Sequence, residues 1–153
     1  MTATATEVIR RLQGKTLVTA ESLTGGMIGT ALTAVPGASV VYKGGVISYV
    51  NGVKEEILGV PAEILERYGA VSMWTAGYMA SGVRKLLKAD FAVSVTGLAG
   101  PGGDEFGHDV GTVFIGFDSD PKSVAREYHF TGSREEIRQQ TVKAALKLIL
   151  ENI

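Results

Sequence analysis

The hydrophobic and polar positions of this chain follow two repeating patterns. Short apolar runs, typical of buried strands, are separated by longer segments in which apolar residues recur every three or four positions, as on one face of a helix. The short runs predict strands at residues 16–20, 45–50, 91–96, 110–117 and 125–130. The longer segments predict helices at residues 4–13, 24–35, 52–58, 61–68, 72–88 and 134–151. Strands that alternate with helices indicate an α/β fold with helices on both faces of the sheet.

Local signals support several of these boundaries. Thr4 and Glu7, and again Ser133 and Glu136, have the spacing of a capping box, which predicts that a helix begins at each pair. The turn-forming residues 118–121 lie between the last two strands and predict an antiparallel hairpin. We therefore expect a mixed, mainly parallel sheet.

Length and composition restrict the possible functions. A chain of 153 residues is expected to form a single domain over residues 1–153. The net charge of −1 gives no electrostatic reason to expect a nucleic-acid partner. No apolar run approaches a membrane span, and the first residues lack the apolar core of a signal peptide, so we expect a cytoplasmic protein with no membrane partner. The absence of cysteine excludes a thiol nucleophile and any Cys-ligated metal.

A serine at the junction of a strand and a helix is the first candidate for chemistry. Ser22 lies between the strand that ends near residue 20 and the glycines Gly25 and Gly26, which precede an amphipathic segment. Free backbone N–H groups and the positive end of a helix dipole gather at such a junction, and they suit a nucleophile or a bound phosphate. Alternatively, Ser22 or Thr24 simply caps the helix.

The chain offers few bases that could activate a serine. Its two histidines are His129, expected to be structural within a strand, and His108, in a polar loop with Asp104, Glu105 and Asp109. That loop matches no metal-ligand spacing, and a solvated loop is favoured over a metal site. If the serine is a nucleophile, its base is therefore expected to be a lysine.

Lys54 is the lysine best placed for that role. It follows a predicted strand and lies in the first turn of a short predicted helix, where a cation opposes the helix dipole. A general base near neutral pH needs a lysine pKa of roughly 7–8 instead of about 10.4, and burial must supply most of that change. Glu55 and Glu56 would oppose the change if they turned inward. The alternative is an ordinary exposed lysine.

A glycine-rich loop at residues 97–103 follows the predicted strand 91–96 directly. It does not lead into a helix and so does not match the dinucleotide-binding fingerprint. Its successive N–H groups form a candidate anion-binding nest at the sheet edge where α/β proteins bind ligands. A flexible surface turn is the alternative interpretation.

Six motifs, taken together, carry a family resemblance over nearly the whole chain. In order they are AESLTGG at 20–26, GGVISYVNGVK at 44–54, GAVS at 69–72, TGLAGPGG at 96–103, VGTV at 110–113 and TGSREEIRQQ at 131–140. This combination resembles the nicotinamide mononucleotide deamidase family, also called the CinA C-terminal domain. The resemblance implies a three-layer α/β/α sandwich. It also implies hydrolysis of nicotinamide mononucleotide to nicotinate mononucleotide and ammonia.

The resemblance assigns roles to individual residues. It implies Ser22 as nucleophile, Lys54 as base and Arg138 as a further catalytic residue of the last helix. The residues implied at the substrate are Glu21, Thr24, Gly25, Gly26, Tyr49, Thr96, Gly97, Ala99, Gly100 and Arg134. Leu23, Val50 and Gly52 differ from the residues that the family often has, which puts substrate preference and rate in doubt. Longer family members carry an extra N-terminal domain that we do not expect here.

The expected mechanism is an acyl-enzyme route that needs neither a metal nor an organic cofactor. Neutral Lys54 would take the Ser22 proton, and backbone N–H groups near 24–26 or 96–100 would stabilise the oxyanion. Arg138 and Arg134, one helical turn apart, are the candidates for holding the phosphate. The resemblance also suggests a homo-oligomer, a dimer or larger. Two alternatives remain: a nucleotide-binding accessory module without catalysis, related to competence and damage, and a hydrolase of another small amide.

Overall fold

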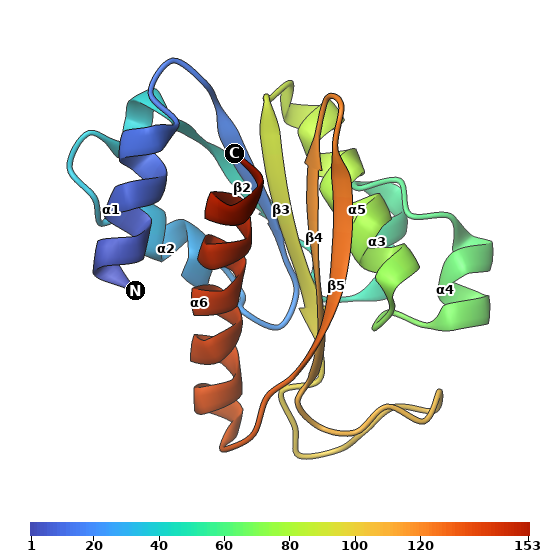
Figure 1. The fold of residues 1–153 in the computed structure, drawn as a ribbon. Coiled ribbons are helices and arrows are strands. Elements are labelled where there is room, and N and C mark those ends of the chain that lie inside the picture. Colours follow the sequence, from blue (N-terminus) through green and yellow to red (C-terminus); the bar gives the residue numbers. More distant parts are fainter.

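A five-stranded sheet forms the centre of the computed structural model, which describes residues 1–153 (Figure 1). The strands are β1 (Leu17–Glu21), β2 (Tyr42–Ile47), β3 (Phe91–Gly97), β4 (Thr112–Ser119) and β5 (Ser123–His129), in the order β2-β1-β3-β4-β5. β1 is parallel to both β2 and β3, whereas β4 is antiparallel to β3 and β5. Only β4 therefore runs against the others, and the predicted mixed, mainly parallel sheet and its terminal hairpin are confirmed.

Helices cover both faces of the sheet and produce three layers, as expected. Figure 1 shows α1 (Thr2–Arg11), α2 (Met27–Thr33) and α6 (Arg134–Asn152) on one face. The other face carries α3 (Asn51–Glu56), α4 (Ala62–Tyr68) and α5 (Met73–Leu87), and a 3-10 turn at Ala38–Val40 precedes β2. None of these helices is both long enough and apolar enough to span a membrane.

Each face of the sheet has its own hydrophobic core. Neighbouring residues of β1 point to opposite faces, so Leu17 enters the larger core with Leu146 of α6, and Val18 enters the smaller core with Val83 of α5. All five residues of β1 are buried. Burial on both faces fits the apolar residues Leu17, Val18 and Ala20, and it also encloses the polar Thr19 and Glu21.

Two predicted helix starts are wrong. α1 begins at Thr2, so Thr4 and Glu7 lie inside the helix and form no capping box; Glu7 instead accepts a hydrogen bond from Arg10 Nε at 3.0 Å. α2 begins at Met27 rather than at residue 24, because Gly25 and Gly26 have φ values of 56° and 106°, which are left-handed. The capping box of Ser133 and Glu136 is confirmed at the start of α6.

Candidate active site

Three strand ends meet at one edge of the sheet and supply the candidate site. β1, β2 and β3 are parallel, so their carboxyl ends open on the same side. Ser22 follows β1, Ser48 and Tyr49 follow β2, and Thr96 and Gly97 end β3. β1 lies between β2 and β3 in the sheet. From β1 the chain therefore crosses first to β2 on one side and later to β3 on the other side. Ligands of open α/β sheets bind at such a switch point.

The turn from Ser22 to Gly26 presents the serine at this edge. Ser22 is 7 % exposed, and its N–H donates to Val95 O of β3 at 3.1 Å. Its own carbonyl accepts from Gly25 N at 3.1 Å, which closes the turn. The left-handed glycines then redirect the chain into α2, a path that a residue with a Cβ follows only at a cost of about 1–2 kcal/mol.

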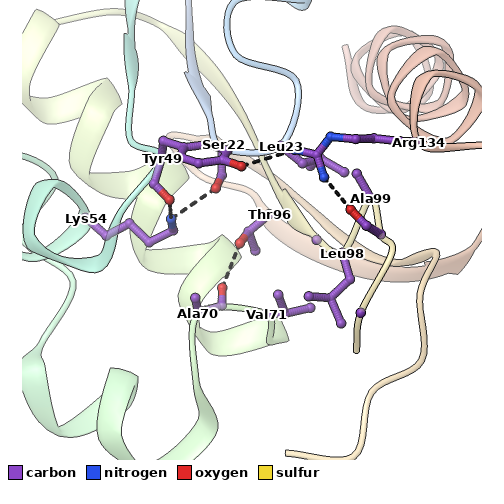
Figure 2. Close-up of a pocket in the computed structure, with 13 residues that line it drawn as sticks. Ser22, Leu23, Tyr49, Lys54, Ala70, Val71, Thr96, Leu98, Ala99 and Arg134 are labelled. Atoms are coloured by element: carbon purple, nitrogen blue, oxygen red, sulfur yellow. Dashed lines mark hydrogen bonds between the residues drawn. The ribbon is translucent and has the colours of Figure 1, made fainter. Parts of the chain in front are cut away.

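Lys54 extends from α3 to the serine and is almost completely buried, at 1 % exposure. Its Nζ lies 3.0 Å from Ser22 Oγ and 3.3 Å from Tyr49 O (Figure 2). It also lies 2.6 Å from Ser48 O. Glu55 and Glu56 are exposed, so neither carboxylate turns inward toward the amine. The structure thus brings together the serine and the lysine that the sequence singled out.

Three acceptors surround Nζ, which matches the three N–H groups of an ammonium, and an uncharged amine can satisfy them as well. A neutral amine has two N–H groups and one lone pair, and two carbonyl oxygens together with one hydroxyl surround Nζ. The two carbonyls can accept the N–H groups, which leaves the lone pair for the Ser22 hydroxyl proton. Burial lowers the pKa of Lys54 from 10.5 to about 8. Burial, which the sequence analysis expected to supply most of the shift, is its cause; the smaller contribution expected from the helix dipole is not supported, because Lys54 falls in the last turn of the short α3.

A cavity of about 290 Å³ lies over this pair. Among the residues singled out from the sequence, it is lined by Ser22, Lys54, Tyr49, Thr96, Gly97, Ala99, Gly100 and Arg134. Two further lining residues, Leu98 and Gly102, belong to the predicted glycine-rich loop, whereas the sequence assigned no site role to the remaining ones, Leu23, Ala70 and Val71. The GAVS motif contains two of them. Thr96 Oγ1 donates to Ala70 O at 2.7 Å and so ties that motif to the end of β3 (Figure 2).

The two basic side chains that line the cavity are Lys54 and Arg134, and Arg134 is the one that is always a cation. Lys54 lies at the inner end, and Arg134 of α6 reaches the cavity from the opposite side (Figure 2). The Arg134 guanidinium donates to Tyr49 Oη at 3.1 Å and also to Gly100 O. No carboxylate lines the cavity. The cavity therefore suits an anionic ligand, with Arg134 as the partner of its charge.

Five of the residues implied by the resemblance do not line the cavity: Glu21, Thr24, Gly25, Gly26 and Arg138. Arg138 lies behind the serine turn, where Nε donates to Leu23 O at 2.9 Å and Nη2 to Thr24 O at 3.4 Å. Glu21 turns toward the first residues of α2. The side chains of Glu21 and Arg138 hold the backbone that carries Ser22, and neither of them faces the cavity.

Backbone N–H groups are available to stabilise an oxyanion. The N–H groups of Leu23 and Thr24, directly after the serine, donate to no backbone carbonyl. The same is true of Ala99 and Gly100 in the glycine-rich loop. Because Leu23, Ala99 and Gly100 also line the cavity, unpaired donors flank Ser22 from two segments.

Neither histidine belongs to this site. His108 Nδ1 lies 2.8 Å from Asp104 Oδ2 within the loop between β3 and β4, and His129 is exposed beside Glu127 on β5. Neither lines the cavity. No group of three or more histidine or carboxylate side chains has an arrangement that could hold a metal ion.

Comparisons with known proteins agree with the fold and with the motifs. The family model described as the CinA C-terminal domain matches residues 1–153. A curated relative from Bacillus subtilis (strain 168), which carries a competence-damage inducible name, is 46% identical over 139 residues, 91% of this chain and 33% of the relative. The chain thus spans about a third of the length of the curated relatives it matches.

Solved structures give the same result. The competence damage-inducible protein A from Klebsiella pneumoniae superposes with a TM-score of 0.96 at 35% identity, covering 99% of this chain and 95% of that one. A competence/damage inducible protein from Agrobacterium tumefaciens superposes with a TM-score of 0.95 at 38% identity, covering 98% and 93% of the two chains. These likenesses extend over the whole sandwich, including the sheet edge that carries the cavity.

Proposed function

The chain belongs to the CinA C-terminal domain family, and from that premise we propose that it is an amidohydrolase acting on nicotinamide mononucleotide. The products are nicotinate mononucleotide and ammonia. The names of the relatives describe competence and damage responses and state no reaction. The proposal therefore depends on the chemistry of the site and on the motifs that the chain shares with the deamidase family.

The contact between Ser22 and Lys54 carries the proposal. A protein that only binds a nucleotide has no use for a buried lysine beside a serine, because burying an ammonium opposes folding. A hydrolase does have a use for it, since burial keeps the amine available as a base near neutral pH. The 3.0 Å separation of Nζ and Oγ permits direct proton transfer.

The reaction proceeds in two steps on these residues. Neutral Lys54 takes the proton of Ser22 as Oγ attacks the carboxamide carbon, and the N–H groups of Leu23 and Ala99 stabilise the oxyanion. The C–N bond then breaks, and the Lys54 ammonium returns the proton to the leaving ammonia. Water, deprotonated in turn by Lys54, hydrolyses the acyl ester and releases the carboxylate product.

The Arg134 guanidinium supports a nucleotide monophosphate as substrate. Arg134 lies across the cavity from the Ser22–Lys54 pair, so the amide and the phosphate of one molecule can occupy its two ends (Figure 2). A guanidinium binds phosphate oxygens in a fork, and Tyr49 beside it can donate a further hydrogen bond. Arg138, which is tied to the serine turn, is not in position to serve the phosphate.

Ammonia release from nicotinamide mononucleotide tests the proposal. The purified chain is expected to release ammonia, while Ser22→Ala and Lys54→Met lose at least about 10³-fold in kcat because the two residues act as a unit. Nicotinamide mononucleotide binding, followed by calorimetry, should persist in Ser22→Ala. Binding without ammonia release in the unsubstituted chain would instead support the accessory module, and release from other amides alone would support a different substrate.

A further inference from the structure

Glu21 is a buried carboxylate that no cation neutralises. It is the last residue of β1, directly before Ser22, and is only 2 % exposed. None of the ion pairs in the chain includes it. Burying a carboxylate opposes folding strongly unless hydrogen bonds replace its water. Its surroundings therefore need to supply donors.

Three donors surround the Glu21 carboxylate. One comes from within the Ser22–Gly26 turn, and two come from the first turn of α2. Thr24 Oγ1 donates to Oε1 at 2.6 Å from within the turn. Ile28 N donates to Oε1 at 2.8 Å and Gly29 N to Oε2 at 3.0 Å from the first turn of α2. Three donors and no acceptor suit the ionised, acceptor-only form. One side chain thus fixes the turn and the helix that follows it to the end of β1.

The backbone of the same residue leads to the lysine. Glu21 O accepts from Ser48 N at 2.9 Å, and Ser48 O accepts from Lys54 Nζ at 2.6 Å. A single residue, Ser48, therefore links Glu21 O to the amine, and Ser22 is the next residue along the chain. We therefore expect a shift of the Glu21 backbone to change the distance between Ser22 Oγ and Lys54 Nζ.

We propose that the Glu21 carboxylate is a positioning residue, which holds the Ser22 turn in the orientation that lets Lys54 take the serine proton. The resemblance had implied a contact with substrate, but the carboxylate faces Thr24 and α2 and does not line the cavity. The inference rests on the proposed amidohydrolase function. It extends that function by separating the residues that bind the substrate from those that orient the nucleophile.

Glu21→Gln is the first test, because it keeps the shape and replaces one oxygen with an NH₂ group that cannot accept. One of the three donors that bind the Glu21 carboxylate then faces the NH₂ group of the glutamine, which is also a donor. We expect this unfavourable contact to shift the turn. We expect kcat for ammonia release to fall by about 10- to 100-fold, the usual effect of a misplacement of about 1 Å, with KM changed by less than about 2-fold. Thr24→Val should lower kcat in the same way, and Thr24→Ser, which keeps the hydroxyl, should restore it.

Asp118→Asn is the matched control for loss of a buried carboxylate. Asp118 is 6 % exposed and accepts from Arg84 Nε at 2.6 Å, but it lies near the opposite end of β4 from the cavity. This substitution should lower the melting temperature and leave kcat within about 2-fold. A fall of kcat in Asp118→Asn equal to that in Glu21→Gln would show a general effect of stability and overturn the positioning role.

A fluorophosphonate reagent gives a readout that does not depend on the substrate. Its phosphorus bonds to Ser22 Oγ, fluoride leaves and Lys54 takes the proton, so the labelling rate reports the Ser22–Lys54 geometry alone. Slower labelling of Glu21→Gln than of the unsubstituted chain supports the positioning role. If the unsubstituted chain is labelled but does not hydrolyse nicotinamide mononucleotide, the proposed substrate is wrong and the positioning role stands. Unchanged labelling and kcat, or a raised KM at unchanged kcat, would overturn it. A wild-type chain that neither labels nor hydrolyses would overturn both proposals.

Discussion

At the scale of single residues, the site separates two arginines that the sequence left as joint candidates for the phosphate. Arg134 and Arg138 lie one turn apart on α6, and the sequence could assign either to the phosphate. In the structure Arg134 lines the cavity and Arg138 binds the carbonyls of Leu23 and Thr24. Helical spacing places both on one side of the helix, but it does not show how far each side chain extends or which acceptors it meets.

Arg134→Ala should weaken substrate binding without disabling the chemistry. Loss of a charge-assisted contact worth about 1.5–3 kcal/mol is expected to raise KM for nicotinamide mononucleotide by roughly 10- to 100-fold at nearly unchanged kcat. Arg138→Ala should instead lower kcat, because it releases the serine turn. Arg126→Ala, on the far edge strand, is the control for loss of a surface arginine. Steady-state kinetics of the three variants, with nicotinamide riboside as the substrate that lacks phosphate, distinguish these effects.

If Arg134 binds phosphate, its removal should matter little for the riboside. An equal loss on both substrates would contradict that role for Arg134.

At the scale of elements, the turn between β1 and α2 decides where the nucleophile lies. The left-handed glycines Gly25 and Gly26 set the path of residues 22–26. The Glu21 carboxylate and the Arg138 guanidinium hold the same five residues by hydrogen bonds. The sequence identified this junction correctly from its strand, glycines and helix. It placed the start of α2 too early, because Thr24 has the residue type of a helix cap and the sequence does not report the left-handed φ of Gly25 and Gly26. The start of α6 was predicted correctly, because Ser133 and Glu136 form the local contacts that their spacing implies.

Gly26→Ala tests the importance of this turn. Gly26 has a φ of 106°, and an added Cβ would lie 3.4 Å from Ile47 Cδ1. We expect a loss of about 1–2 kcal/mol in the free energy of unfolding and a clear loss of kcat. Gly37→Ala is the matched control, since Gly37 has a φ of 84°, open space around it and no role at the cavity. Denaturant unfolding and turnover of both variants provide the comparison; equal turnover of the two would contradict the importance of this turn.

At the scale of the whole molecule, the sheet order brings together segments far apart in the sequence. The sequence predicted all five strands and the layered α/β architecture, most clearly for the buried strands β3 and β4, which give long apolar runs. It placed the half-exposed β2 three residues too late, at 45–50 instead of Tyr42–Ile47. It did not give the order β2-β1-β3-β4-β5 or the reach of Lys54 across to Ser22. Those depend on which strand ends lie side by side, and periodicity carries no information about long-range pairing.

The buried lysine should make stability depend on pH in a defined direction. The pKa of Lys54 is about 8 in the folded chain against 10.5 for the free side chain, so the unfolded state binds more protons between these values. The free energy of unfolding therefore rises with pH from about 8 to 10.5, by about 3 kcal/mol in total, relative to Lys54→Met. Denaturant titrations of both proteins at pH 7 and 10 measure this difference. If the free energy of unfolding changed by the same amount between pH 7 and 10 in both proteins, Lys54 would not be buried as described.

The pH dependence of kcat/KM for ammonia release tests the central claim most directly, because it reports the base of the free enzyme. If neutral Lys54 activates Ser22, kcat/KM should rise about tenfold per pH unit below the pKa of about 8 and level off above it. Lys54→Met should show no such rise. A rate that is flat from pH 6.5 to 9, or a Lys54→Met variant that turns over at the rate of the unsubstituted chain, would contradict the account.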